Sequence, residues 1–374
     1  MTHPIMKGIL NFLKSETVLV IAALAAAISA CIVQPSMEYL DYLDFRVLAL
    51  LFCLMAVVAG LGRVGVFQVV SQSLLRRAAN IRILALVLVL LCFFSAMLIT
   101  NDVALITFVP LAMMVLALTD PRTIAYVVTL QTVAANLGSM LTPVGNPQNL
   151  YLFAYYHMTV RSFLELTLPL TGFSLLLLIA ATLFVKVRAI ELRFPYRARI
   201  GSRKQLAMFI GLFLLCLLTV LGLMHYLVTT AAVLLSLLLT NRQLFRRIDY
   251  GLLLTFISFF IFVGNMSRIE AVRSLVAETI AGKELVAAIL LSQGISNVPA
   301  AVMLSAFTQA SQALVIGTNL GGLGTLVASL ASLISFKQYS KQKNSSVPLY
   351  LAIFTVVNLL MLLILTGFAL IWYP

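Results

Sequence analysis

Residues 136–149 read NLGSMLTPVGNPQN and lie inside a segment that is otherwise apolar enough to cross a lipid bilayer. Gly138 and Gly145 allow backbone angles that other residues resist. Because Pro143 and Pro147 each lack an N–H group and disfavour helix at the preceding residue, no continuous helix is expected here. An unpaired backbone group costs several kcal/mol in hydrocarbon, so an unwound stretch at this depth must line a cavity or be buried in protein. Broken helices of this kind form the substrate and ion sites of secondary transporters.

The composition is that of a polytopic membrane protein. Of the 374 residues, 62% are hydrophobic and 10% are charged, whereas soluble domains are about 25% charged. The net charge of +13 comes from cations clustered between apolar runs, a pattern that indicates membrane topology and not nucleic-acid binding. The cysteines are far apart in apolar sequence, so no disulfide framework or cysteine-rich metal site is expected; they are Cys31, Cys53, Cys92 and Cys216.

Apolar windows of about 17 to 25 residues predict nine crossings of the membrane. The expected spans, of which 122–157 and 314–335 are broken, are 15–33, 43–62, 122–157, 162–187, 205–224, 226–240, 248–265, 314–335 and 347–372. Residues 1–14 form a short amphipathic lead. The first span has no small-residue cleavage pattern, so we expect it to be retained.

The distribution of cations predicts the orientation of the chain. With the N-terminus inside and the C-terminus outside, twenty of the 25 Lys and Arg residues fall on the inside. The outside loop 34–44 contains three acidic residues and no cation. This bias is typical of the bacterial-type cytoplasmic (inner) membrane. The basic loop 186–204 is interpreted as an orientation signal in contact with anionic lipid.

Two further apolar segments, 82–119 and 284–313, each contain a polar notch. The run Leu285 to Ile295 before the second notch reaches only about 16 Å, roughly half of the hydrocarbon thickness. Ser296-Asn297-Val298-Pro299 is therefore the predicted tip of a re-entrant hairpin. In the first segment each arm is near the lower limit for a full crossing. Either a hairpin or two spans joined by Thr100-Asn101-Asp102 fits, and the duplication described next favours the hairpin.

The sequence contains an internal duplication. Asp44 is followed nineteen residues later by Arg63, and Asp249 is followed at the same spacing by Arg268. By the span count, Asp44 lies outside and Asp249 lies inside. The two copies are therefore predicted to run in opposite directions, as in the inverted-topology repeats of secondary transporters.

Two motifs recur in the same order. Ile-Thr-Asn at 99–101 corresponds to Ile-Ser-Asn at 295–297, and NLGSMLTPV from Asn136 corresponds to NLGGLGTLV from Asn319. The predicted organisation is a lead with the first span (1–42), repeat 1 (43–187, with hairpin 82–119 and broken span 122–157), a basic loop with connecting spans (188–247) and repeat 2 (248–374, with hairpin 284–313 and broken span 314–335).

The polar residues of the tips and breaks predict an ion-coupled anion site. Carbonyl, Asn, Ser and Thr oxygens suit hard cations such as Na⁺, and helix N-termini suit an anion. This chemistry is present once in each copy. Asp102 is the only acidic residue predicted deep in the membrane. It is interpreted either as a proton or Na⁺ site or as a cap of the second hairpin arm.

These motifs resemble those of the ion transporter superfamily, which includes divalent anion/sodium symporters, citrate transporters, arsenite permeases and sodium/proton antiporters. The resemblance is carried by ITNDVALITFVP, NLGSMLTPVGNPQN, ISNVPAAVML and NLGGLGTLVASLASLI, and within the superfamily it extends to small inner-membrane proteins of the YbiR type. It implies an all-α polytopic membrane protein with two re-entrant hairpins and two broken transmembrane helices. It also implies an elevator-type homodimer, in which a scaffold domain holds the dimer and a transport domain carries the substrate.

By motif position, the resemblance implies two ion sites with the substrate between the two tips. Na⁺ would bind at Thr100, Asn101, Asn136 and Gly145, and at the mirror set Ser296, Asn297, Asn319 and Gly321. The full set of expected ion- and substrate-binding residues is Thr100, Asn101, Asp102, Asn136, Gly138, Thr142, Pro143, Gly145, Asn146, Pro147, Asn149, Ser296, Asn297, Val298, Pro299, Thr318, Asn319, Gly321, Gly322 and Thr325.

The tips depart from those of dicarboxylate symporters. Such symporters characteristically carry Ser-Asn-Thr at both tips, whereas here the tips read Thr-Asn-Asp and Ser-Asn-Val. The second broken span also lacks the Pro-Pro-Asn ending of several relatives. Tips of this kind are more similar to those of the arsenite permease and antiporter branches, which leaves the dicarboxylate specificity open.

The leading functional hypothesis is a secondary active transporter that moves a small anion with Na⁺ or H⁺ as coupling ion and without another cofactor. The alternatives are a cation/proton antiporter, with Asp102 exchanging the ions, or an arsenite-type efflux permease on the same fold. An enzyme is not expected, because the chain has no HExxH, no GxSxG and no paired carboxylates within the membrane. A passive channel would not require an inverted duplication with broken helices.

Overall fold

The computed structural model describes residues 16–76, 78–189, 197–342 and 345–373. Within these ranges the regular structure is helical, apart from an isolated antiparallel bridge between Asn80 and Ala189. The predicted all-α fold is therefore confirmed. The predicted lead 1–14 and part of the basic loop 186–204 lie outside the described residues.

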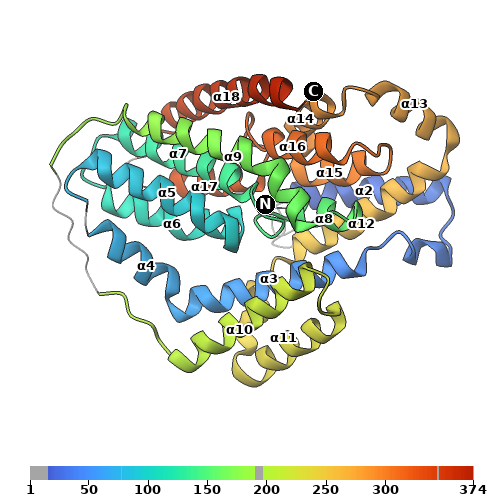
Figure 1. Cartoon of the computed structure of the whole chain (residues 1–374), viewed down its shortest axis with the longest axis horizontal. Helices are drawn as coiled ribbons and strands as arrows, with labels where there is room; N and C mark the ends of the chain where they lie inside the picture. Colours follow the sequence, from blue (N-terminus) through green and yellow to red (C-terminus); the bar gives the residue numbers. More distant parts are fainter. Residues whose placement is uncertain (1–15, 77, 190–196, 343–344, 374) are drawn as a thin grey trace, which may run out of the picture.

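The helices follow the apolar segments of the sequence closely (Figure 1). In chain order they are α2 (Thr17–Ile32), η1 (Met37–Leu40), α3 (Phe45–Val64), α4 (Val66–Leu75), α5 (Ile81–Ile99), α6 (Asn101–Val115), α7 (Pro121–Ser139), α8 (Pro147–Tyr155), α9 (Val160–Thr182), α10 (Arg203–Val220), α11 (Tyr226–Thr240), η2 (Arg242–Arg247), α12 (Tyr250–Arg268), α13 (Glu270–Ile280), α14 (Glu284–Ile295), α15 (Asn297–Ser305), α16 (Ser311–Gly321), α17 (Leu330–Ser340) and α18 (Val347–Trp372).

Six helices of the described chain are long and apolar enough to cross a membrane, namely α3, α5, α9, α10, α12 and α18. Two helices were not expected from the sequence, α4 and α13. Helix α4 follows α3 directly because Gly65, with φ of +94°, turns the chain between them. Helix α13 has 11 residues and begins at Glu270. It is too short and too polar to be detected by apolar windows of the length of a membrane span.

The interruption expected within 136–149 is present. Helix α7 ends at Ser139, and α8 begins at Pro147 after the N-cap Asn146, whose side chain accepts a hydrogen bond from the backbone N–H of Asn149 at 2.9 Å. The corresponding break in the second half separates α16 from α17, which begins after the N-cap Ser329. Each break thus ends at a polar residue that starts a new helix.

Two helical hairpins accompany the two breaks. Helices α5 and α6 meet at Thr100, with φ of 70°, and α14 and α15 meet at Ser296, with φ of 78°. Positive φ is uncommon for residues other than glycine, and strained backbone of this kind clusters at functional sites. The two tips therefore share an unusual backbone conformation as well as a sequence motif.

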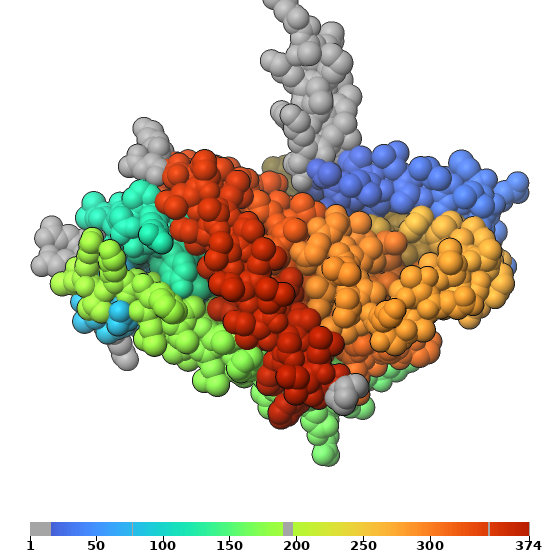
Figure 2. Space-filling model, turned by 90° about the horizontal axis from the view of Figure 1, so that it is seen from above, coloured from blue at the N-terminus to red at the C-terminus, as the bar shows by residue number. Residues whose placement is uncertain are grey.

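The two halves of the chain interlock. The first arm of each hairpin packs within its own half, α5 against α7 and α14 against α16. The second arm packs across, α6 against α17 and α15 against α8. Helix α18 lies over this assembly, against α7, α9 and α16, and in Figure 2 it crosses the visible face between segments of the first half and the second half. The second arm of each hairpin thus contacts the helix that follows the break of the other half.

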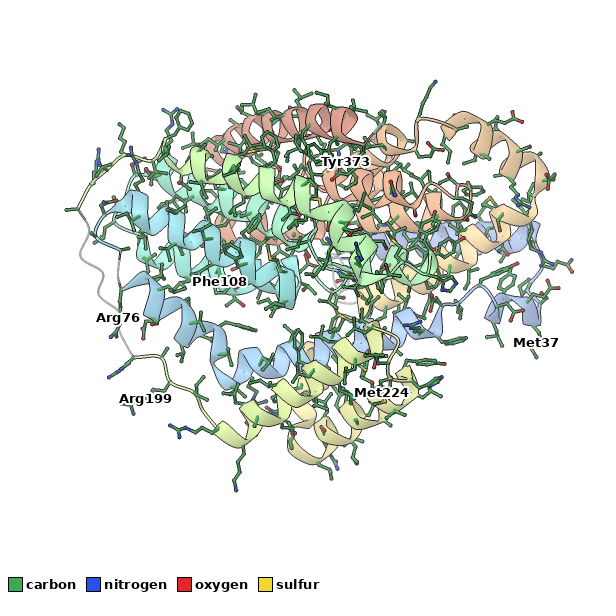
Figure 3. The ribbon with its side chains drawn as sticks, viewed as in Figure 1. Met37, Arg76, Phe108, Arg199, Met224 and Tyr373 are labelled. Carbon is green, nitrogen blue, oxygen red and sulfur yellow. The ribbon has the colours of Figure 1, made fainter. Side chains whose placement is uncertain are left out.

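The remaining helices lie beside this assembly. Helices α10 and α11 pack against α3, and α2 packs against α12. The two equivalent aspartates of the duplication cap α3 and α12 in the same way, since Asp44 accepts from the N–H of Val47 and Asp249 from that of Leu252, both at 2.9 Å. Figure 3 shows Arg76 at one edge of the molecule and Met37 at the opposite edge.

Candidate functional site

The two hairpin tips and the two helix breaks meet in a buried polar junction. Its central side chains are those of Asn101, Asn136, Asn146 and Asn319, which are 4%, 3%, 2% and 2% exposed. Buried carboxamides must find hydrogen-bond partners, because leaving one unpaired costs about 1–3 kcal/mol. The partners that they find define the geometry of the site.

The first tip is hydrogen-bonded to both sides of the first break. The backbone N–H of Asn101 donates to the carbonyl oxygen of Gly145 at 3.1 Å, and its Nδ2 donates to Oδ1 of Asn136 at 3.1 Å. Its own Oδ1 accepts from the N–H of Asp102 at 3.0 Å. All polar groups of the Asn101 side chain and its N–H are thereby used.

The second tip makes the equivalent backbone contact. The N–H of Asn297 donates to the carbonyl oxygen of Ala328 at 3.0 Å, and the hydroxyl of Ser296 donates to the same oxygen at 3.4 Å. Gly145 and Ala328 each directly precede the N-cap of the helix that follows the break. The two tips are therefore bound to the same point of their respective breaks.

The N-cap residues join the two halves. Asn146 Nδ2 donates to Asn319 Oδ1 at 3.0 Å, and Ser329 Oγ donates to Asn136 Oδ1 at 3.0 Å. Asn319 in turn donates to Asn149 Oδ1 at 2.6 Å. The family resemblance implied two mirror-related ion sites. In the structure, hydrogen bonds link residues of both sets in a single network. The reason is the crossed packing, which brings the N-cap of each half beside the asparagine of the other.

Three of the predicted glycines allow close approach of neighbouring segments. A Cβ atom at Gly138 would lie 2.1 Å from the carbonyl oxygen of Phe93, and one at Gly145 would lie 2.1 Å from that of Ser139. A Cβ atom at Gly321 would lie 2.4 Å from Ser292 Oγ. These positions exclude any side chain, so the arms of both hairpins sit directly against the broken helices.

Some predicted residues lie outside the network. Thr142 donates to the carbonyl oxygen of Met97, Thr318 donates to that of Leu314 in its own helix, and Thr325 is exposed and donates to that of Gln293 at 3.0 Å. Gly322 takes part through its backbone, since its carbonyl oxygen accepts from Asn136 Nδ2 at 3.2 Å and its N–H donates to the carbonyl oxygen of Asn319 at 3.2 Å. The remaining predicted residues, which are buried beside the network, are Pro143, Pro147, Val298 and Pro299.

Three residues of the site were missed from the sequence. Ser329 and Ser139 bind Asn136 and Asn146 respectively. Gln293 holds the second break, since its Nε2 donates to the carbonyl oxygens of Gly321 and Leu323 at 3.0 Å each. Two of these had a signal in the sequence: Ser329 aligns with Asn146 if the repeat is extended, and Gln293 is a polar residue in the apolar run before the second tip.

Asp102 lies in the first turn of α6, directly after the first tip. Its Oδ1 is buried and makes no hydrogen bond to any of the described residues. Helix α6 begins at Thr100 without a side-chain cap. Burying an ionised carboxylate without a partner is costly, so this position is suited to a group that takes up a proton or a cation. Elsewhere in the described chain, no three His, Cys, Asp or Glu side chains converge as a metal site.

Interlocked helical hairpins and interrupted helices, in a chain with several membrane-length helices, define a multi-pass membrane transporter. The chain belongs to the citrate transporter family, whose sequence model matches residues 7–313. The resemblance to the ion transporter superfamily, inferred from the four motifs, is therefore confirmed. The family is one of transporters and not of enzymes, and one of the relatives described next is also named a transporter.

Two relatives match over most of their length. The chain is 30% identical over 347 residues to "Uncharacterized transporter MJ0456" of Methanocaldococcus jannaschii, covering 91% of this chain and 94% of that protein. It is 29% identical over 305 residues to "Inner membrane protein YbiR" of Escherichia coli, covering 80% and 82%. The fold is similar to that of the YdaH transporter of Alcanivorax borkumensis, with a TM-score of 0.52, 14% identity and coverage of 96% and 98%.

Proposed function

We propose that the protein is a secondary active transporter that moves a small anion across the cytoplasmic membrane with Na⁺ or H⁺ as coupling ion. The observation that carries this proposal is the buried junction in which each tip is hydrogen-bonded to the break of its own half, while Asn146 and Asn319 join the two breaks. Carboxamide and carbonyl oxygens are the ligands that hard cations prefer. The N-termini of α8 and α17 offer positive helix ends to an anion.

The length of α14 supports a position of this junction near the middle of the bilayer. Helix α14 has 12 residues and is about 18 Å long, about half of the hydrocarbon thickness. Its tip therefore ends within the membrane if its first residue lies at the surface. Helix α5 has 19 residues and is about 28 Å long. Both tips belong to one junction, so we place them at the same depth and treat both hairpins as re-entrant.

The transport cycle that we propose is an elevator movement within a homodimer. The moving part would contain the hairpins and broken helices, α5–α8 and α14–α17, because the crossed contacts make these helices one packed unit. Helices α2, α3 and α10–α12 would form the scaffold. The inverted orientation of the two repeats, with the N-terminus inside and the C-terminus outside, would give the unit two equivalent facings.

A second candidate function is favoured by the unpartnered carboxylate of Asp102. A carboxylate beside the junction that binds either a proton or Na⁺ would allow the two ions to exchange. The same fold would then act as a cation/proton antiporter. An arsenite-type efflux permease, driven outward, is a further variant of this mechanism.

Transport by the purified protein in proteoliposomes tests both functions. We expect uptake of an anion, found first by thermal-shift screening of anions with and without Na⁺ at two pH values, to depend on an imposed Na⁺ or proton gradient. Exchange of Na⁺ for protons without any anion would instead establish the antiporter. Anion flux that is unaffected by either gradient would exclude coupled transport and leave a passive pathway.

A further inference from the structure

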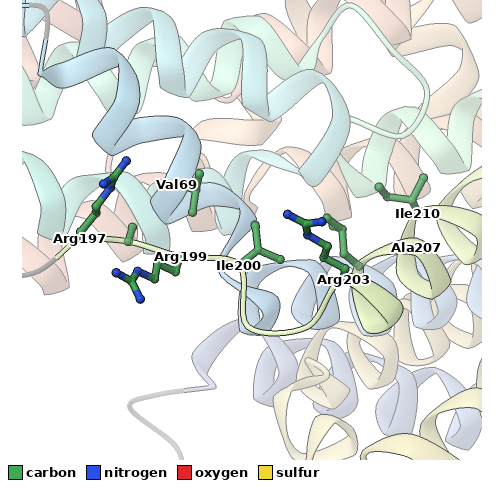
Figure 4. A pocket seen from close by; sticks show the side chains of 9 residues that line it. Val69, Arg197, Arg199, Ile200, Arg203, Ala207 and Ile210 are labelled. Carbon is green, nitrogen blue, oxygen red and sulfur yellow. The ribbon is translucent and has the colours of Figure 1, made fainter.

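A surface pocket of about 640 Å³ lies away from the junction, between α4, the loop at residues 197–201 and the start of α10. Three arginines line it, Arg197, Arg199 and Arg203. Figure 4 shows them along the loop together with apolar side chains, among them Val69 and Ile200. The pocket thus combines a strongly cationic wall with an apolar wall.

The cationic loop is held in place by the corner between α3 and α4. The N–H of Gly201 donates to the carbonyl oxygen of Val64 at 3.0 Å, and the N–H of Ala198 donates to Gln72 Oε1 at 2.8 Å. A Cβ atom at Gly65 would lie 2.9 Å from the carbonyl oxygen of Arg199. The backbone that carries the arginines is therefore fixed against the body of the protein, and the pocket is preformed.

The three guanidinium groups have no acidic counterpart among the residues that the structure describes. No ion pair or side-chain hydrogen bond joins Arg197, Arg199 or Arg203 to any of the described residues. The ion pairs found there involve other arginines, Arg161 with Glu165 and Arg268 with Glu38. Three cations without an ion-pair partner among the described residues favour the binding of an anion from outside the protein. Phosphate oxygens fit this role, because the planar guanidinium group can donate two parallel hydrogen bonds to them.

The apolar wall continues out of the pocket along α10. Ile210 lines the pocket, and Leu214 and Leu218 follow at intervals of four residues on the same face of the helix. Their side chains are 46%, 54% and 39% exposed. An exposed apolar stripe that begins at a cationic pocket fits a molecule with an anionic head and a hydrocarbon tail.

We infer that this pocket binds the phosphate group of an anionic phospholipid, with an acyl chain along Ile210, Leu214 and Leu218. The three arginines belong to the cations that the positive-inside distribution places on the inner side, where anionic lipid attracts them. A soluble anion would contact the arginines alone and would make no contact with the apolar stripe on α10. The inference does not depend on the transported substrate.

The test measures binding of a fluorescent phosphatidylglycerol to the purified protein in neutral detergent. We expect the wild type to bind it in preference to the matching phosphatidylcholine. The triple variant Arg197→Gln, Arg199→Gln and Arg203→Gln should bind about a hundredfold more weakly. Each arginine near anionic lipid contributes about 1 kcal/mol of attraction, and the loss of three corresponds to about this change in affinity. The control triple Arg242→Gln, Arg246→Gln and Arg247→Gln removes the same charge at η2 and should change binding less than threefold.

Two further measurements distinguish a lipid from a soluble anion. Ile210→Ser keeps all three arginines, and we expect it to weaken lipid binding several-fold. Inorganic phosphate and glycerol phosphate should not displace the lipid. Displacement by either anion, or an unchanged affinity of Ile210→Ser, would overturn the assignment. Equal losses in the two arginine triples would show nonspecific attraction to the surface and would also overturn it.

The wild type provides a check that does not rely on any variant. Phosphatidylglycerol should raise the thermal stability of the protein in a saturable manner, because a ligand that binds only the folded state stabilises it. Phosphatidylcholine at the same concentration should not. The same stabilisation by both lipids would contradict a phosphate site that selects for negative charge.

Discussion

Asn146 donates a hydrogen bond to Asn319 at 3.0 Å and so joins two helix breaks that are 173 positions apart in the chain. A corresponding bond runs in the other direction, because Ser329, the N-cap of α17, donates to Asn136 in the first half. Each break is thus completed by the N-cap of the other half. The two breaks are therefore joined by hydrogen bonds between the halves in both directions.

The Asn146–Asn319 contact should be measurable as an energetic coupling. Asn146→Ala and Asn319→Ala each remove one hydrogen bond from the buried carboxamide that remains, and each should lower the stability by about 1–3 kcal/mol. Because the two residues share this bond, the double variant should lose less than the sum of the single losses, with a coupling of about 0.5–3 kcal/mol. Unfolding in detergent provides the measurement, and strictly additive losses would argue against the contact.

The asparagines of the two tips should be needed for transport. We expect Asn101→Ala and Asn297→Ala to abolish uptake in proteoliposomes while both variants still insert into the membrane. Asn101→Ala removes the side-chain hydrogen bond to Asn136, and Asn297→Ala removes a buried carboxamide that we propose as an ion ligand at the second tip. His225→Ala is a suitable control, since His225 is exposed at the start of α11, and it should retain uptake. Full uptake by both asparagine variants would remove these residues from the site.

Asp102→Asn should separate transport from its driving ion. The amide keeps the size of the side chain but cannot bind a proton at neutral pH or carry a negative charge for Na⁺. Uptake should then lose its dependence on the pH gradient or the Na⁺ gradient, whichever drives the wild type. An unchanged dependence on both gradients would assign a structural role to this carboxyl group.

Gly138→Ala should destabilise the protein by pushing the first hairpin off α7. The new methyl group would lie 2.1 Å from the carbonyl oxygen of Phe93, which is backbone and cannot rotate away. We expect a loss on the order of 1–3 kcal/mol, as for other overpacked interiors. The control is Gly211→Ala in α10, where nothing lies within 4 Å of the added atom. The control should be neutral or slightly stabilising, and equal melting temperatures for the two variants would contradict the close packing.

Local chemistry explains how much of the fold was predictable. Runs of apolar residues mark helices whatever their partners are, so α3, α5, α12 and α18 were predicted to within about three residues of their bounds. Gly145, Pro143 and Pro147 act on the adjacent backbone, so the first break was also predictable from its own residues. Helices α4 and α13 were not predicted because, with 10 and 11 residues, both are shorter than a membrane span.

The candidate site was only partly predictable. The repeat identified Asn101, Asn136, Asn297 and Asn319, since matching positions in two copies do not depend on knowing the packing. It did not identify Gln293, because nothing in the sequence shows that its amide reaches the carbonyl oxygens of Gly321 and Leu323. Thr318 was included for its neighbours in the motif, yet its hydroxyl is bonded within its own helix.

The sequence by itself determined the class of protein, the helical segments, the two breaks and the residues at the tips, because hydropathy, glycine, proline and repetition act locally along the chain. Only the tertiary structure decided that hydrogen bonds link asparagines of both halves in one network. Packing of α6 on α17 and of α15 on α8 sets which residues meet across the two halves. Such contacts depend on the directions of helices distant in the chain, and no spacing within the sequence encodes them.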